Sequence, residues 1–156
     1  MTRTMQDITG SEKSAQRLSL WNHFDLSTNN GIRSILDRID QEPPQHVWLS
    51  MECGPYSVMQ NVNQRTPEQQ QALEEKRKTV LKQYVGGAIV YQYCIQKGIH
   101  CTWEWAQSCQ AWRLPLVQHI MKRYQVYFAI TRGCQVDLKD PKGQFISKGW
   151  KNDDHQ

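Results

Sequence analysis

The sequence lacks any run approaching the roughly 18 apolar residues that a membrane span requires, so we expect no transmembrane segment. Residues 1–13 contain no apolar core of a secretory signal peptide, so none is expected. The sequence does not exclude an amphipathic transit peptide, although Asp7 and Glu12 argue against one, because such peptides are poor in acidic residues. The chain also has no CxxC pair, P-loop, HExxH motif or Gly-x-Gly, which removes the common signatures of zinc and phosphate sites.

Cysteine occurs in an odd number and at irregular spacing. A secreted disulfide scaffold would be denser in cysteine and would usually hold an even number. We therefore expect free, mostly buried thiols in an intracellular reducing compartment, and no metal site. The five positions are Cys53, Cys94, Cys101, Cys109 and Cys134.

The net charge of +4 is unevenly distributed over the 156 residues. Residues 1–66 hold 6 Lys and Arg against 7 Asp and Glu, whereas residues 67–156 hold 13 against 8. A basic second half is compatible with a polyanionic partner. The densest basic cluster, Lys76 to Lys82, follows two glutamates, so a solvated helix face with local ion pairs is the alternative.

In the first part of the chain, the hydrophobic pattern predicts a strand, a helix and a strand. Residues 1–17 show no periodicity and are expected to form a flexible arm. Residues 18–25 alternate loosely, as in a short strand, and an apolar stripe from Ile32 to Ile39 predicts a helix. Residues 46–50 form a compact apolar run suited to a buried strand.

The second part begins with a helix-start signal, in which Thr66 is the N-cap, Pro67 opens the first turn and Gln69 closes a capping box. The helix is expected to end at Gly98 and to have a weak point at Gly86-Gly87. Four further elements are predicted: a strand over 99–105, a helix from Pro115, a strand over 126–130 and a β-hairpin over 134–150.

This order predicts the α/β class. We expect a single Rossmann-like, mostly parallel sheet with flanking helices and a C-terminal antiparallel hairpin. The predicted domain covers residues 18–151, with a tail at 152–156.

Three candidate site positions fall at the carboxyl ends of predicted strands, where α/β sheets bind ligands: Asp25, the pair Glu52-Cys53, and Glu104. Two carboxylates and a thiol could converge there on one ligand. A packed, unreactive Cys53 is the alternative, because reactivity needs a cationic neighbour or a helix N-terminus, and Glu52 would raise the thiol pKa.

Two segments resemble the cytosine carbon-5 DNA methyltransferases. Val47 to Ser57 is similar to the strand and Pro-Cys loop of that family, and Thr102-Trp-Glu-Trp105 is similar to its strand ending in Glu-Asn-Val. The resemblance implies that Cys53 would attack carbon 6 of a flipped cytosine and that Glu104 would hold the ring. It also implies that Asp25 would lie by the adenine of the cofactor.

The chain departs from this family at decisive points. Glu52 stands where the family has proline, and Trp105 stands where it has asparagine. The stretch before residue 20 is too short for the family's first two strands, which carry the Gly-rich loop for S-adenosylmethionine. We therefore expect no cofactor and no methyl transfer by this chain alone.

A second resemblance covers about two thirds of the chain. The segments 47–66, 74–77, 103–105, 109–115 and 148–150 resemble an uncharacterised domain of copia-type retrotransposon polyproteins. This implies a setting among nucleic-acid-handling proteins.

We expect a non-catalytic binding or assembly module that holds nucleic acid or a larger complex through the 51–65 loop and the basic second half. A Cys53-dependent enzyme that needs a partner for its cofactor is one alternative. A structural subunit held by Trp21 and Trp150 is another. Trp103, Trp105 and Trp112 could stack on bases or belong to the core and its rim. The candidate nucleic-acid-binding residues are Arg65, Lys76, Arg77, Lys82, Lys122 and Arg123.

Overall fold

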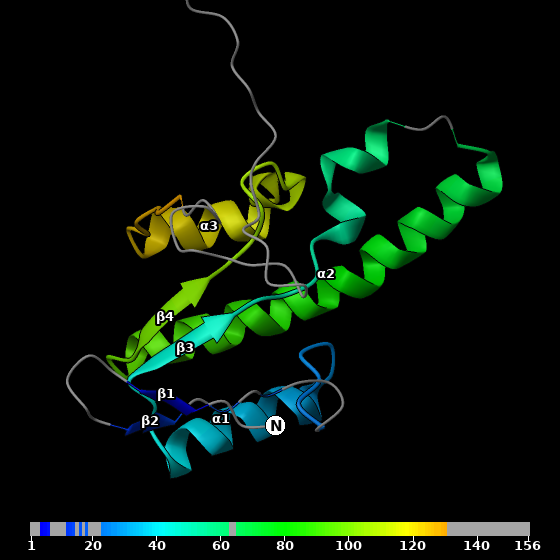
Figure 1. Cartoon of the computed structure of the whole chain (residues 1–156). Helices are drawn as coiled ribbons and strands as arrows, with labels where there is room; N and C mark the ends of the chain where they lie inside the picture. Colours follow the sequence, from blue (N-terminus) through cyan, green and yellow to red (C-terminus); the bar gives the residue numbers. More distant parts are fainter. Residues whose placement is uncertain are drawn as a thin grey trace, which may run out of the picture. The chain divides into compact units, whose positions relative to one another are not determined.

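The longest element of the chain is helix α2 (Pro67–Gln96), drawn in green in Figure 1. The computed structural model describes residues 4–6, 12–14, 16, 18, 23–62 and 65–130. Thr66 Oγ1 accepts from the Gln69 backbone at 3.3 Å, and Gln69 Oε1 accepts from the Thr66 backbone at 3.2 Å. Gly98, with a φ of 71°, follows the last turn. The predicted capping box and glycine stop are therefore confirmed.

Helix α1 (Asn29–Gln41) follows equally local signals. Thr28 Oγ1 caps it by accepting from the Gly31 backbone at 3.0 Å. Ile35 and Ile39 are buried on its inner face, which packs against α2. The helix predicted from the apolar stripe is confirmed.

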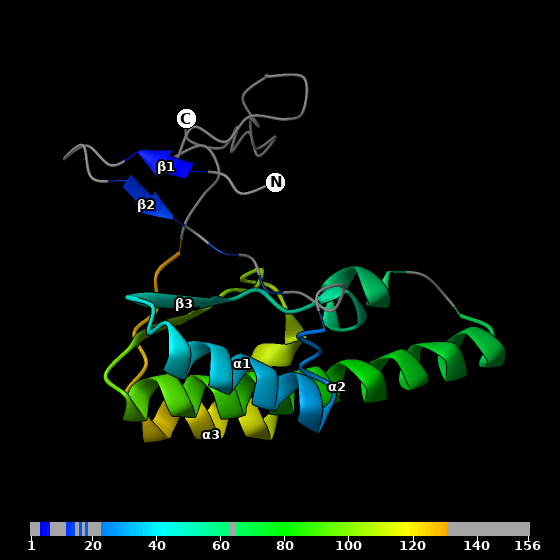
Figure 2. The same cartoon turned by 90° about the horizontal axis from the view of Figure 1, so that it is seen from below.

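Strands β3 (His46–Leu49) and β4 (His100–Trp103) pair in parallel, each residue of β3 opposite the residue 54 positions later. Parallel neighbours require a long crossover connection, and α2 supplies it. Figure 2 shows α1, α2 and α3 (Pro115–Arg123) on one side of β3. The described residues thus combine helices with a two-stranded parallel sheet, in agreement with the α/β class. The described residues do not show the single Rossmann-like sheet that the sequence predicts.

The core lies between the sheet and the helices. Its largest fully buried side chains come from α2 and α3, and Leu49 and Met51 add to it from β3 and the residues after it. No helix in the described part of the chain is long and apolar enough to cross a membrane, as expected from the sequence. The largest fully buried side chains are Tyr84, Val90, Cys94 and Val117.

Helix α2 runs without interruption through Gly86 and Gly87, so the predicted weak point does not break the helix. A Cβ on Gly86 would overlap the carbonyl oxygen of Leu26, and a Cβ on Gly87 would lie 2.7 Å from Met51 Cε. The two glycines therefore serve close packing, because they let the turn before α1 and the segment after β3 approach the helix.

The predicted strand 126–130 is absent, and of the predicted strand 18–25 only residues 18 and 23–25 are described, none of them as strand, while residues 19–22 lie outside the described residues. His23 has a φ of 65°, and the Thr28 backbone donates to Asp25 O at 3.1 Å, so the end of the predicted strand 18–25 is a turn. The predicted strand 126–130 has no regular secondary structure. Short apolar runs do not form strands unless a neighbouring strand supplies hydrogen bonds.

The N-terminal residues contain two short strands where a flexible arm was predicted. Strands β1 (Thr4–Gln6) and β2 (Glu12–Ser14) pair antiparallel, with Met5 opposite Lys13. Each strand is only three residues long. A two-stranded hairpin of this length contributes little stability by itself.

The chain divides after Tyr124 into two units, and the second comprises Gln125–Gln156. Residues 125–130 of this second unit are described, and Tyr127 is exposed there. The predicted hairpin 134–150 lies outside the described residues. The same holds for Cys134 and for the two tryptophans of the structural-subunit hypothesis, Trp21 and Trp150.

Candidate functional site

Glu104 lies where the sequence predicts it, directly after the last residue of β4. Its backbone N–H donates to Leu49 O at 2.9 Å and so extends the parallel ladder by one bond. Ser50, which follows β3, donates its hydroxyl to Glu104 Oε2 at 2.7 Å. The strand-end carboxylate is therefore engaged by a serine hydroxyl on the neighbouring strand end.

Cys53 opens the 3-10 helix η2 (Gly54–Tyr56) and is half-buried. Its carbonyl accepts from the Tyr56 backbone at 3.0 Å. Its thiol neighbours that of Cys109, whose pKa is raised by burial first and then by Cys53. A raised pKa keeps Cys109 a neutral thiol at neutral pH, so it offers Cys53 no charge that would activate it.

An aromatic cluster holds the segment between β3 and Cys53. Tyr84 Oη donates to Glu52 O at 2.6 Å, and Trp105 Nε1 donates to Met51 O at 2.9 Å. The Tyr84 and Trp105 rings pack with centroids 4.6 Å apart, and burial raises the pKa of Tyr84. Two side chains from distant elements thus fix the backbone that leads into the candidate site.

The three tryptophans that could have formed a base-stacking platform belong to this cluster. Trp103 and Trp112 each approach Trp105 edge-on at 5.0 Å. Trp105 is buried, and the other two are half-buried. The core-and-rim alternative is therefore the one that the structure supports. Trp48 of β3, which the sequence did not single out, is 62% exposed.

A depression of about 350 Å³ lies between the 51–65 loop and the first turns of α2. Arg65 donates from its guanidinium to Gln60 Oε1, and Gln60 Nε2 donates to Gly54 O at 3.1 Å. This relay of hydrogen bonds orients the Arg65 side chain at the depression. The polar side chains that line it are Glu52, Gln60, Arg65, Gln69 and Lys76.

Arg77 fastens the loop to α2. Its Nε donates to Pro55 O at 3.1 Å, and its guanidinium pairs with Glu74 at 2.8 Å. The same group lies 5.4 Å from the centre of the Tyr56 ring. Burial raises the pKa of Tyr56, while the charge of Arg77 acts in the opposite direction. Arg77 therefore holds the loop that lines the depression against α2.

The structure brings together only part of the predicted nucleic-acid set. Arg65 and Lys76 line the depression, and the exposed Lys82 lies farther along α2. Lys122 and Arg123 occupy the last turn of another helix, α3, and line neither this depression nor the cavity between α1 and α2.

Asp25 is not at a strand end. It lies in the turn before α1, where its Oδ1 accepts from the Ser27 backbone at 2.8 Å. The sequence predicted that Asp25, Cys53 and Glu104 lie together at one sheet edge. Since residues 23–26 form no strand, the prediction is wrong for Asp25. Neither Cys53 nor Glu104 lines the depression.

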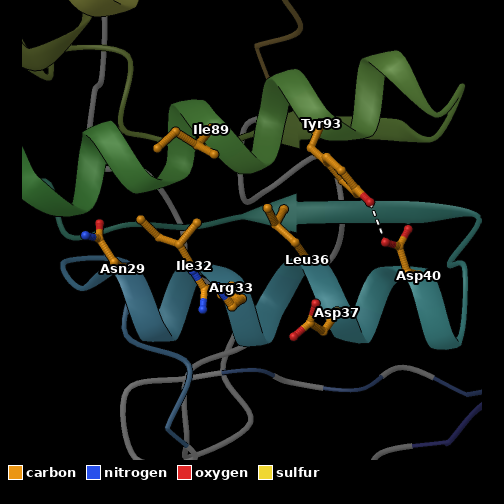
Figure 3. A pocket seen from close by; sticks show the side chains of 8 residues that line it. All are labelled: Asn29, Ile32, Arg33, Leu36, Asp37, Asp40, Ile89 and Tyr93. Atoms are coloured by element: carbon orange, nitrogen blue, oxygen red, sulfur yellow. Dashed lines mark hydrogen bonds between the residues drawn. The ribbon is translucent and has the colours of Figure 1, made fainter.

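A second cavity, of about 360 Å³, lies between α1 and α2 and was not predicted (Figure 3). Tyr93 Oη donates to Asp40, and Lys97 Nζ lies 3.1 Å from Asp40 Oδ1. These two contacts, that of Tyr93 first, lower the pKa of Asp40. In the sequence, the available signal for this surface was the place of Ile32 and Leu36 in the apolar stripe of α1.

Comparisons with protein-family models, with curated proteins and with solved structures find no match to this chain.

Proposed function

We propose that the chain is a non-catalytic binding module that holds the phosphate backbone of a nucleic acid in the depression beside α2. The observation that carries this proposal is the convergence of Arg65 and Lys76 from two different elements on one depression. Gln60 and Gln69 line it as well and add amide groups. Guanidinium, ammonium and amide donors are the groups that contact phosphates in nucleic-acid interfaces.

The pairing of charges along α2 supports Lys76 as the cation that a phosphate would meet. Lys78 pairs with Glu75 at 2.8 Å, and Arg77 pairs with Glu74. Within the described residues, no salt bridge engages Lys76 or Lys82. Glu52 also lines the depression, so the two cations there outnumber the one carboxylate.

The β3–α2–β4 unit is compatible with descent from the second half of a methyltransferase-like, Rossmann-like core, or from the retrotransposon-type domain that the sequence resembles. A parallel pair joined by a crossover helix is the repeating unit of such sheets. We include this descent in the proposal. The basic depression would then be a surface retained after the loss of cofactor chemistry.

The proposal predicts salt-dependent binding. Fluorescence anisotropy with labelled single-stranded and double-stranded oligonucleotides measures it directly. If two or three phosphates are contacted, the dissociation constant should rise by about tenfold to fortyfold between about 50 and 200 mM salt. No binding, or binding that salt does not affect, would contradict the proposal and favour a structural subunit.

Lys76→Glu should weaken binding by about tenfold and reduce the salt slope by about one, because a phosphate contact is replaced by a repelling carboxylate. Lys78→Glu is the matched control, since it makes the same charge change two residues away at a lysine outside the depression. Equal losses in the two variants would mean that only net charge matters, and the depression would not be the site.

The proposal also predicts that Cys53 forms no covalent bond with nucleic acid. Mass spectrometry after incubation with a 5-fluorocytosine duplex and S-adenosylmethionine should show the unmodified chain. The physical reason is that neither Cys53 nor Glu104 lines the depression in which the nucleic acid is held. An adduct that disappears in Cys53→Ser would establish the enzyme alternative instead.

A further inference from the structure

The surface between α1 and α2 is apolar along its floor. Ile32 and Leu36 rise from α1 towards α2, and Ile89 of α2 completes the floor (Figure 3). The apolar row continues along α2 through Val85 and Leu81, at four-residue spacing. Ile89 and Val85 are 43% and 45% exposed. A continuous apolar row on two neighbouring helices is typical of an interaction surface.

The outer wall of this surface carries opposite charges one helical turn apart. Arg33 and Asp37 are exposed on α1 and line the cavity (Figure 3). No salt bridge joins them in the part of the chain that the structure describes, although residues four apart on a helix are neighbours. Asp40, by contrast, is engaged by Tyr93 and Lys97.

We propose that this surface binds a second copy of the chain, with the two α1 helices antiparallel across a two-fold axis. In such an interface residue i meets residue j while j meets i. With the axis crossing α1 midway between Arg33 and Asp37, Arg33 of each copy lies opposite Asp37 of the other, so the charged wall is complementary to itself. The apolar rows of both copies then cover each other, and four helices pack as in a bundle.

Self-complementarity favours a second copy over a different partner. A foreign helix could cover Ile32, Leu36 and Ile89 equally well, but it would not require a positive and a negative side chain arranged symmetrically about the centre of the contact. The apolar floor supplies the driving force, and the charges set the antiparallel register.

Sedimentation equilibrium of the full chain over a range of concentrations tests the proposal. We expect a monomer–dimer equilibrium, and we expect Ile89→Glu to raise the dissociation constant by at least about tenfold, because a charge enters the apolar contact. Val58→Glu is the matched control, since Val58 is 40% exposed and does not line the surface. It should leave the dimer unchanged. A monomer at every concentration, or equal effects of the two variants, would overturn the proposal.

A charge exchange tests the antiparallel register. Arg33→Asp alone places two carboxylates opposite each other twice in the dimer and should weaken it by about tenfold or more. The double variant Arg33→Asp with Asp37→Arg restores opposite charges and should return the dissociation constant to within about threefold of the original. Loss without restoration would exclude the proposed pairing.

Discussion

Replacing Gly86 with alanine is expected to lower the free energy of unfolding by about 2–4 kcal/mol. In an ordinary helix interior the same change adds about 0.5–1 kcal/mol of stability, so the predicted sign is opposite to the usual one. A Cβ on Gly86 would overlap Leu26 O and would lie 2.9 Å from Leu26 C and 3.1 Å from Ile32 Cδ1. The clash involves backbone, so the turn before α1 must move away from α2.

Gly87→Ala is the matched control for this prediction. Its Cβ would meet Met51 Sδ and Cε, which are the far end of a flexible side chain, and it lies 3.8 Å from Trp103. Met51 can change rotamer, so we expect a change of about 1 kcal/mol or less. Urea denaturation followed by circular dichroism measures both variants. A Gly86→Ala protein at least as stable as the original would refute the close approach of Leu26 to the helix.

The helices could be predicted because their signals are local. The capping box of Thr66 and Gln69 and the stripe of α1 each depend on residues within a few positions of one another. The strands β3 and β4 could be predicted because each lies in a compact or alternating run beside a helix. The same kind of run was wrong at 126–130, and at 18–25 the described residues, 18 and 23–25, form no strand.

The role of Gly86 and Gly87 could not be predicted, because it depends on Leu26 and Met51, which are far away in the sequence. A glycine pair in a helix pattern indicates weakness unless something is known to pack there. The tertiary contact outweighs the local propensity at this position.

The candidate site was predictable in composition but only partly in arrangement. Glu104 follows β4 as predicted because the end of a strand is a local property. The neighbour of Cys53 is Cys109, 56 residues later, and no spacing rule indicates that contact. Arg65 and Lys76 meet at one depression because Arg77 and Gln60 fold the loop against α2, and these contacts are formed by tertiary structure.

Replacing Trp105 with alanine is expected to be the most destabilising single change in the aromatic cluster, at about 3–5 kcal/mol. Trp105 is only 8% exposed and packs against the rings of Tyr84, Trp103 and Trp112. The variant loses this packing and leaves Met51 O without its buried donor. Chemical denaturation monitored by circular dichroism measures the loss.

Trp48→Ala is the control, because it removes the same side chain at a position that is 62% exposed, and it should cost less than about 1 kcal/mol. Trp105→Phe separates packing from hydrogen bonding: it keeps an aromatic ring but removes the donor to Met51 O, and about 1–3 kcal/mol should be lost. Since Met51 leads directly into the loop that carries Arg65, this variant should also weaken oligonucleotide binding under conditions where it remains folded. A Trp105→Phe protein with unchanged stability and binding would show that the aromatic cluster does not position the depression.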